Sequence, residues 1–188
     1  LLAVLRLQAQ VAERPRRLEA HAHVVVRVAA EAREYRLREA TVKHLQSAGG
    51  DYDYILIDCP PSLGLLTLNA LVAADAVLVP LQCEFYALEG LSMLLRTVER
   101  VRKAFNPALN IQGVVLTMFD VRNNLSEQVA ADVREHLGDK VYQTVIPRNV
   151  RVSEAPSHGM PVLVYDLRCA GSRAYIHLAS EVIKRERS

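Results

Sequence analysis

Long apolar runs and paired cysteines are both missing from this 188-residue sequence. No apolar run is long enough to span a bilayer, and the first residues lack the charged start and apolar core of a secretory signal. The three cysteines, Cys59, Cys83 and Cys169, are odd in number and widely spaced, which argues against both a disulfide framework and a set of metal ligands. We therefore expect a cytoplasmic protein with reduced thiols and no membrane anchor.

An excess of basic charge is also missing from most of the chain. Residues 1–50 hold nine Lys or Arg against five Glu, whereas the remaining residues hold 14 Lys or Arg against 16 Asp or Glu. The larger part of the chain is therefore slightly acidic. Any contact with nucleic acid must come from a local basic patch and not from net charge.

Among the residues that are present, the stretch 53–62 (DYILIDCPPS) is the most informative. Its apolar run Tyr54–Ile57 has no polar alternation, which predicts a strand buried on both faces of a parallel sheet. The run ends in Asp58, and the prolines that follow cannot continue a strand. Open α/β sheets bind ligands at the carboxyl ends of their strands, where an aspartate can hold Mg²⁺ through water. The alternative is that Asp58 only caps the turn.

Strand and helix patterns alternate along the chain, which predicts an α/β fold with a parallel sheet flanked by helices. After Asp58, we expect strands at 76–81, 111–118 and 141–146. We expect helices at 33–47, 63–72, 87–104 and 170–187, and one that is capped by Asn124 or Ser126 and runs to 137. Near the start, residues 1–20 show helical spacing and residues 21–28 have the pattern of a strand.

Five stretches resemble the ParA/Soj chromosome- and plasmid-partitioning ATPases, in the order that this family has them. Ile55–Gly64 (ILIDCPPSLG) is similar to the family's Walker B and switch region, and the other stretches are Ala73–Pro80, Glu84–Gly90, Leu116–Arg122 and Ile146–Pro156. The resemblance covers about residues 33–187 and implies a P-loop NTPase fold of the SIMIBI type. It divides the chain into an atypical segment, 1–32, and a ParA-like ATPase domain, 33–188, whose N-terminal part is incomplete.

The chain departs from this family where the phosphate-binding loop belongs. The family begins with a strand and a Lys-Gly-Gly-X-Gly-Lys-Thr-Thr loop, but no Gly is followed by Lys anywhere in this sequence. Such a loop supplies backbone N–H groups and a lysine to the phosphates. We therefore expect a truncated gene, or a reading frame shifted upstream of about Arg33, and a chain that is deficient in ATP hydrolysis.

The resemblance implies a site for ATP and Mg²⁺ that includes three residues of this chain. Asp58 matches the acid that holds Mg²⁺ through water, and residues 59–64 match the segment that senses the γ-phosphate. Pro147 and Asn149 match residues that contact the adenine, since a proline can pack on the base and an asparagine amide can donate and accept. The alternative for these two residues is an ordinary strand-ending turn. No catalytic residue is assigned.

Arg122 and Arg151 each follow a predicted strand and match positions that bind DNA without sequence preference in the family. Arginine suits phosphate because it stays charged and presents a planar fork of donors, although phosphate contacts read no bases. The alternative is a pair of ordinary surface arginines beside Asp120 and Glu154.

The resemblance further implies partners. ATP drives homodimerisation in the family, the dimer binds nucleoid DNA, and a centromere-binding ParB-like protein stimulates hydrolysis. Lys103 and Arg148 are further candidates for the DNA patch. One alternative is a non-catalytic module that keeps only the dimer or DNA surface. Another is a MinD-like positioning ATPase, which is disfavoured because the end of the chain, Glu181–Ser188, alternates in charge and lacks bulky apolar anchors.

Overall fold

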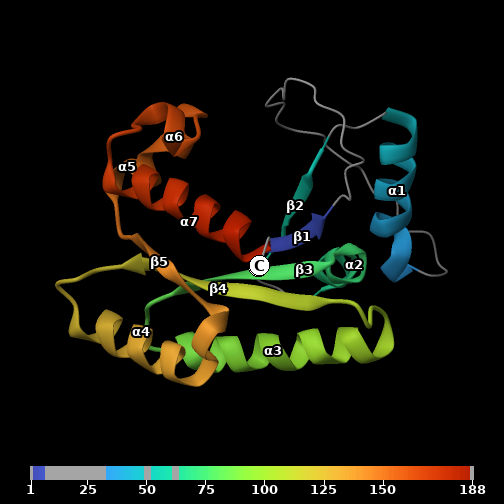
Figure 1. The fold of residues 1–188 in the computed structure, drawn as a ribbon, viewed down its shortest axis with the longest axis horizontal. Helices are drawn as coiled ribbons and strands as arrows, with labels where there is room; N and C mark the ends of the chain where they lie inside the picture. The colour runs from blue at the N-terminus through green and yellow to red at the C-terminus, as the bar shows by residue number, and fades with distance from the viewer. Residues whose placement is uncertain (1, 7–32, 49–51, 61–63, 187–188) are drawn as a thin grey trace. The chain divides into compact units, whose positions relative to one another are not determined.

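The computed structural model describes residues 2–6, 33–48, 52–60 and 64–186 (Figure 1). The strands are β1 (Leu2–Arg6), β2 (Tyr54–Asp58), β3 (Ala76–Gln82), β4 (Asn110–Phe119) and β5 (Val141–Pro147). The α-helices are α1 (Arg36–Ala48), α2 (Leu65–Ala73), α3 (Ala87–Ala104), α4 (Asn124–Leu137), α5 (Val150–Glu154), α6 (Val162–Tyr165) and α7 (Ala170–Glu186). Short 3-10 turns are η1 (Arg33–Tyr35), η2 (Gly138–Lys140) and η3 (Ala155–His158).

These elements belong to two compact units. The first comprises Leu1–Leu78 and Arg96–Gln112, and the second comprises Val79–Leu95 and Gly113–Ser188. β3, α3 and β4 each run from one unit into the other. From β2 onwards the alternation of strands and helices follows the prediction, and the bounds of α3 are the predicted residues 87–104.

In the first unit, β1 lies between β2 and β3 and pairs antiparallel with both, with Leu2 opposite Asp58 on one side and Leu78 on the other. The helix predicted over residues 1–20 is therefore wrong for residues 2–6. Hydrogen bonding to two neighbouring strands outweighs the weak helical spacing of so short a stretch. Residues 7–20 and the strand predicted over 21–28 lie outside the described residues.

The predicted burial of β2 is also wrong. Leu56 is 61% exposed and Tyr54 41% exposed, Asp58 is exposed, and Ile55 and Ile57 are half-buried. Within the described residues β2 pairs only with β1, so it lies at an edge of the sheet. An apolar run without alternation predicted two covered faces, but coverage depends on elements that the run itself does not encode.

The core of the first unit is built on α2. Ala70, Leu71 and Val72 are each only 1% exposed. At the end of this helix the buried side chain of Asn106 donates from Nδ2 to the carbonyl oxygens of Leu71, at 3.0 Å, and Ala74, at 2.7 Å. It thereby satisfies carbonyl groups that a helix C-terminus leaves without partners.

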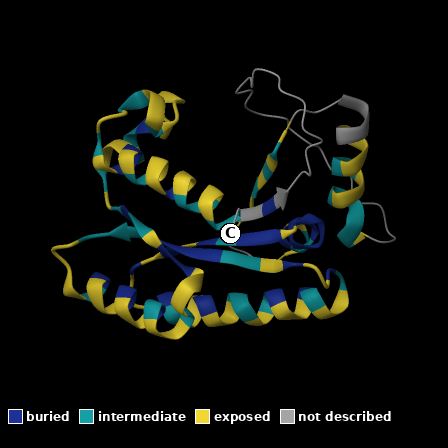
Figure 2. Cartoon of the chain, viewed as in Figure 1, coloured by how far each residue is buried: buried dark blue, intermediate teal, exposed yellow. Residues whose placement is uncertain are grey.

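In the second unit the strand order is β3-β4-β5. β4 and β5 run parallel, and the last residues of the two strands, Phe119 and Pro147, are register partners. The middle of β4 is dark blue in Figure 2, where Val114 and Leu116 are fully buried, whereas the outer side of α4 is exposed. The predicted α/β sheet flanked by helices is confirmed, with β1 as a strand of opposite direction.

A side chain of α7 accepts hydrogen bonds from an irregular part of β5. The register of β5 shifts between Val141 and Val145, and the N–H groups of Gln143 and Thr144 donate to the two carboxylate oxygens of Glu181, at 2.8 and 2.9 Å. Burial by itself raises the pKa of Glu181, but these hydrogen bonds, with a smaller contribution from Arg185, outweigh it and leave the pKa lowered. Hydrogen bonds to a charged group contribute about 1.5–3 kcal/mol each, so this contact is a strong one.

Arg185 extends the same contact. Its guanidinium donates to Glu181 and to the carbonyl oxygens of Asp139 and Val141, and its Cζ lies 4.1 Å above the centre of the Tyr142 ring. The Tyr142 ring lies so close to Gly113 that a Cβ there would approach it to 2.5 Å.

No helix within the described residues is long and apolar enough to cross a membrane.

Candidate functional site

Asp58 lies where the sequence places it, at the carboxyl end of β2 in the first unit, and its side chain is exposed. The next residue, Cys59, is buried, and its thiol donates to the carbonyl oxygen of Ile57 at 3.6 Å. The described part of the chain contains no group of three or more His, Cys, Asp or Glu that could hold a metal ion. One exposed carboxylate still fits Mg²⁺, because this ion keeps several waters and takes its other ligands from phosphates.

Asn149 lies in the second unit, two residues beyond β5, and begins α5. Its Oδ1 accepts hydrogen bonds from the N–H groups of Arg151, at 2.9 Å, and Val152, at 3.4 Å, which is the geometry of a helix N-cap. The turn that the sequence offered as an alternative is therefore present. Because the cap uses the side-chain carbonyl oxygen, the polar atom left for any further contact is Nδ2, which can only donate.

The start of α7 holds this cap in place. Gly171 is buried, and a Cβ added to it would lie 2.3 Å from Cγ2 of Val152 and 3.5 Å from Cβ of Asn149. Only a glycine allows α7 to approach the Asn149 turn so closely. Pro147 is half-buried at the end of β5.

Arg122 lies in a tight turn between β4 and α4. The turn is closed by the Asn123 N–H, which donates to the Asp120 carbonyl oxygen at 2.9 Å, and α4 is capped by Asn123, whose side chain accepts from Leu125 N. The predicted cap at Asn124 or Ser126 is therefore wrong by one to three residues. The side chain of Arg122 is 84% exposed.

The Asp120 carboxylate accepts three hydrogen bonds from Arg122. Oδ1 accepts from the backbone N of Arg122 at 3.0 Å and from Nε at 2.9 Å, and Oδ2 accepts from Nη2 at 2.8 Å. These hydrogen bonds, together with the positive charges of Arg122 and Arg148, lower the pKa of Asp120 to about 2. The same contacts raise the pKa of Arg122, so both groups are charged at neutral pH.

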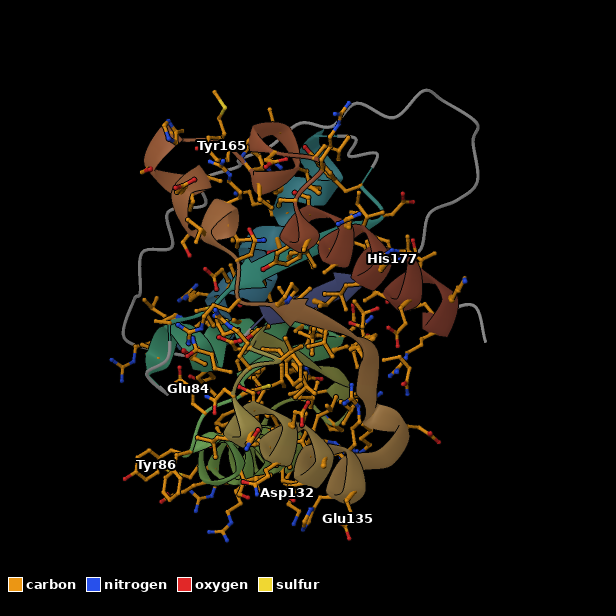
Figure 3. The ribbon with its side chains drawn as sticks, turned by 90° about the vertical axis from the view of Figure 1, so that its left-hand side faces the viewer. Glu84, Tyr86, Asp132, Glu135, Tyr165 and His177 are labelled. Atoms are coloured by element: carbon orange, nitrogen blue, oxygen red, sulfur yellow. The ribbon has the colours of Figure 1, made fainter. Side chains whose placement is uncertain are left out.

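Arg151 and Arg148 are paired with carboxylates too. Arg151 lies 2.9 Å from Glu154 and 3.6 Å from Asp166, and the hydrogen bond to Glu154 is the main cause of its raised pKa. Arg148 lies 3.7 Å from Glu84, which Figure 3 labels after the end of β3. The backbone N of Arg148 also donates to the Phe119 carbonyl oxygen at 2.9 Å, which joins the loops after β4 and β5.

The structure thus brings some predicted residues together and leaves others separate. Arg122 and Arg148 lie at one edge of the second unit's sheet, and Arg151 follows in the next helix. Asp58 and Lys103 belong to the first unit, where Lys103 is exposed on α3.

Three contributors to the site escaped the sequence analysis: Glu84, Asp166 and Gly171. Glu84 had a usable signal, because an acid just after a strand of a parallel sheet lies at the same edge as Arg148. Asp166 is 15 residues from Arg151, and Gly171 acts only through tertiary packing, so neither left a local pattern.

Comparison with known proteins identifies the family. A family model described as an AAA domain matches residues 15–111, just over half of the chain. The chain belongs to this AAA domain family. The predicted resemblance to the ParA/Soj proteins is confirmed as well. Over 155 residues the chain is 70% identical to the chromosome partitioning protein ParA of Caulobacter vibrioides, covering 82% of this chain and 57% of that protein.

Two further comparisons agree. The chain is 58% identical over 151 residues to the sporulation initiation inhibitor protein Soj of Bacillus subtilis, covering 80% of this chain and 58% of that protein. Its fold is similar to that of cobyrinic acid a,c-diamide synthase from Mycobacterium smegmatis, solved with a bound ATP analog and magnesium. The TM-score is 0.66 at 36% identity, covering 85% of this chain and 56% of that one. The chain therefore spans somewhat more than half the length of each of these proteins.

The contact between Asp120 and Arg122 generates a prediction about pH. In the wild-type chain the Asp120 carboxyl should titrate near the value of about 2 instead of 3.8. Because the folded-state pKa is the lower one, the stability that the contact contributes is present above pH 3.8 and is lost as the pH falls towards 2. Arg122→Ala removes the side-chain hydrogen bonds and the charge but keeps the backbone donor of residue 122, so it should return the pKa part of the way to 3.8. NMR titration of the side-chain carboxyl carbon measures both values, and an unchanged pKa in the variant would contradict the contact.

Proposed function

We propose that this chain is part of a ParA/Soj-type ATPase that partitions chromosomes or plasmids. The observation that carries the proposal is the 70% identity to a chromosome partitioning protein over 82% of the chain. In this proposal the complete protein is cytoplasmic, dimerises when it binds ATP, and associates with nucleoid DNA without sequence preference. A centromere-binding ParB-like protein then stimulates hydrolysis and release.

Three residues are assigned to the nucleotide. Asp58 would hold Mg²⁺ through a water molecule, and the charge of the ion would neutralise the phosphates. Pro147 would pack on the adenine, and Asn149 would donate to it from Nδ2 while its Oδ1 caps α5. The assignment is supported by the exposed carboxylate at a strand end, by the Asn149 turn and by the ATP analog and magnesium bound to the cobyrinic acid a,c-diamide synthase.

The chain itself should bind ATP·Mg²⁺ weakly, because no Gly-Lys pair provides a phosphate-binding loop. Without the loop's backbone donors and lysine, the triphosphate loses its principal contacts. Isothermal titration of the 188-residue chain with ATP and Mg²⁺ should show no saturable heat at micromolar concentrations. A dissociation constant near 1 μM, about −8.2 kcal/mol, that is abolished by EDTA would show that other residues replace the loop.

The same absence supports a second candidate function, a non-catalytic module that retains a DNA-binding surface. It shares the assignment of Arg122 and Arg151 to DNA phosphates. These two arginines are exposed, with side chains 84% and 54% accessible, and both lie beyond the carboxyl ends of strands in the second unit.

The DNA assignment predicts the effect of two substitutions. Arg122→Ala and Arg151→Ala should each weaken binding of the chain to duplex DNA of any sequence, by several-fold at low salt. Each should also reduce the slope of log affinity against log salt concentration by about 0.9, the value for one lost phosphate contact. Fluorescence anisotropy with two unrelated duplexes at several salt concentrations measures both quantities.

Arg102→Ala provides the matched control, since Arg102 is also exposed and paired with a carboxylate, Glu99, at 2.8 Å. If Arg102→Ala causes the same loss as the other two variants, only net charge matters and the assigned contacts are wrong. Loss on one duplex alone would mean that the arginines read bases.

A further inference from the structure

Every arginine at the carboxyl-end loops of β4 and β5 is matched by an acid in the described residues. The distances from guanidinium nitrogen to carboxylate oxygen are 2.8–3.7 Å. The pairs are Arg122 with Asp120, Arg148 with Glu84, and Arg151 with both Glu154 and Asp166. Four carboxylates therefore offset the charge of these three exposed arginines.

The Asp120 pair is the tightest of these. Its carboxylate occupies the Nε and Nη2 positions of Arg122, where a phosphate would bind in the same two-point geometry. The lowered pKa of Asp120 keeps this competitor charged at every physiological pH. A phosphate must therefore either displace Asp120 or use the remaining edge of the guanidinium with a negative charge close by.

Arg151 is likewise hydrogen-bonded to a nearby carboxylate, that of Glu154. Glu154 accepts from Nη1 of Arg151 at 2.9 Å, and Tyr165 donates to the same carboxylate oxygen at 3.3 Å, which holds Glu154 towards the arginine. Tyr165 lies in α6 (Figure 3), and its ring stacks on the ring of His158. α6 therefore helps to keep the acid beside Arg151.

We propose that Asp120 and Glu154 set the DNA affinity of a single chain to a low value by competing with phosphate for Arg122 and Arg151. This inference rests on the proposed DNA contacts of the two arginines. Association then depends on presenting several such arginines to DNA at once, and release is easy because each arginine returns to its own carboxylate. Asp120 and Glu154 thus limit the affinity of the two arginines for DNA phosphate.

The test removes each competing charge while it keeps the shape of the side chain. Asp120→Asn retains an oxygen that can accept from the Arg122 N–H, so the turn is preserved, and Glu154→Gln is the equivalent change beside Arg151. Each variant of the 188-residue chain is titrated with a fluorescent duplex at about 50 mM salt, where screening is modest. The controls are Asp132→Asn and Glu135→Gln, which make the same charge change on α4 (Figure 3).

Asp120→Asn and Glu154→Gln should each tighten binding about threefold, the effect of removing one charge about 6 Å from a phosphate in water. The controls should change affinity by less, and adding Arg122→Ala to Asp120→Asn should abolish the gain. The inference is overturned if the two variants bind no tighter than the controls, or if the gain persists without Arg122. It fails separately from the proposed DNA contacts, which are wrong if Arg122→Ala and Arg151→Ala leave DNA binding at the level of their Arg102→Ala control.

Discussion

The parallel pairing of β4 with β5 is the constraint on which the candidate site in the second unit depends. Phe119 and Pro147 end their strands opposite each other, and the Arg148 N–H donates to the Phe119 carbonyl oxygen just beyond them. This arrangement sets the loop that carries Arg122 beside the loop that carries Asn149. α7 supports it from the other side, because Glu181 accepts the two N–H groups that the shifted register of β5 leaves beside it. A loss of that support would move Pro147, Asn149 and Arg122 together, whereas Asp58 belongs to the first unit.

Two kinds of competition shape what this edge can do. Asn149 must cap α5 with its oxygen, so only its amide nitrogen can serve a base. Arg122 and Arg151 must satisfy nearby carboxylates, so only part of each guanidinium can serve a phosphate. In both cases a side chain that the family resemblance assigns to a ligand already has a structural partner. At the two arginines, the proposed phosphate contacts would therefore require exchange with a carboxylate, which favours weak and reversible binding, whereas Asn149 would keep its cap.

The sequence predicted the parts of the fold whose patterns are local and long. The 18 residues of α3 carry repeated helical spacing, and β4 and β5 were placed within one residue at each end. The candidate residues could be found because strand ends, prolines and polar residues coincide there. β1 could not be predicted, since its five residues are a strand only through pairing with two others. The exposure of Leu56 likewise depends on what surrounds β2, and no pattern within β2 reports that.

The central claim is that DNA meets the chain at the loops after β4 and β5. NMR of the arginine side-chain Nε–H groups in the ¹⁵N-labelled chain, during titration with a short duplex, tests it most directly because it reports each guanidinium separately. The signals of Arg122 and Arg151 should shift progressively with DNA, while that of Arg102 in α3 stays in place. Shifts confined to Arg102, or an absence of shifts at Arg122 and Arg151 when binding is measurable, would contradict the account.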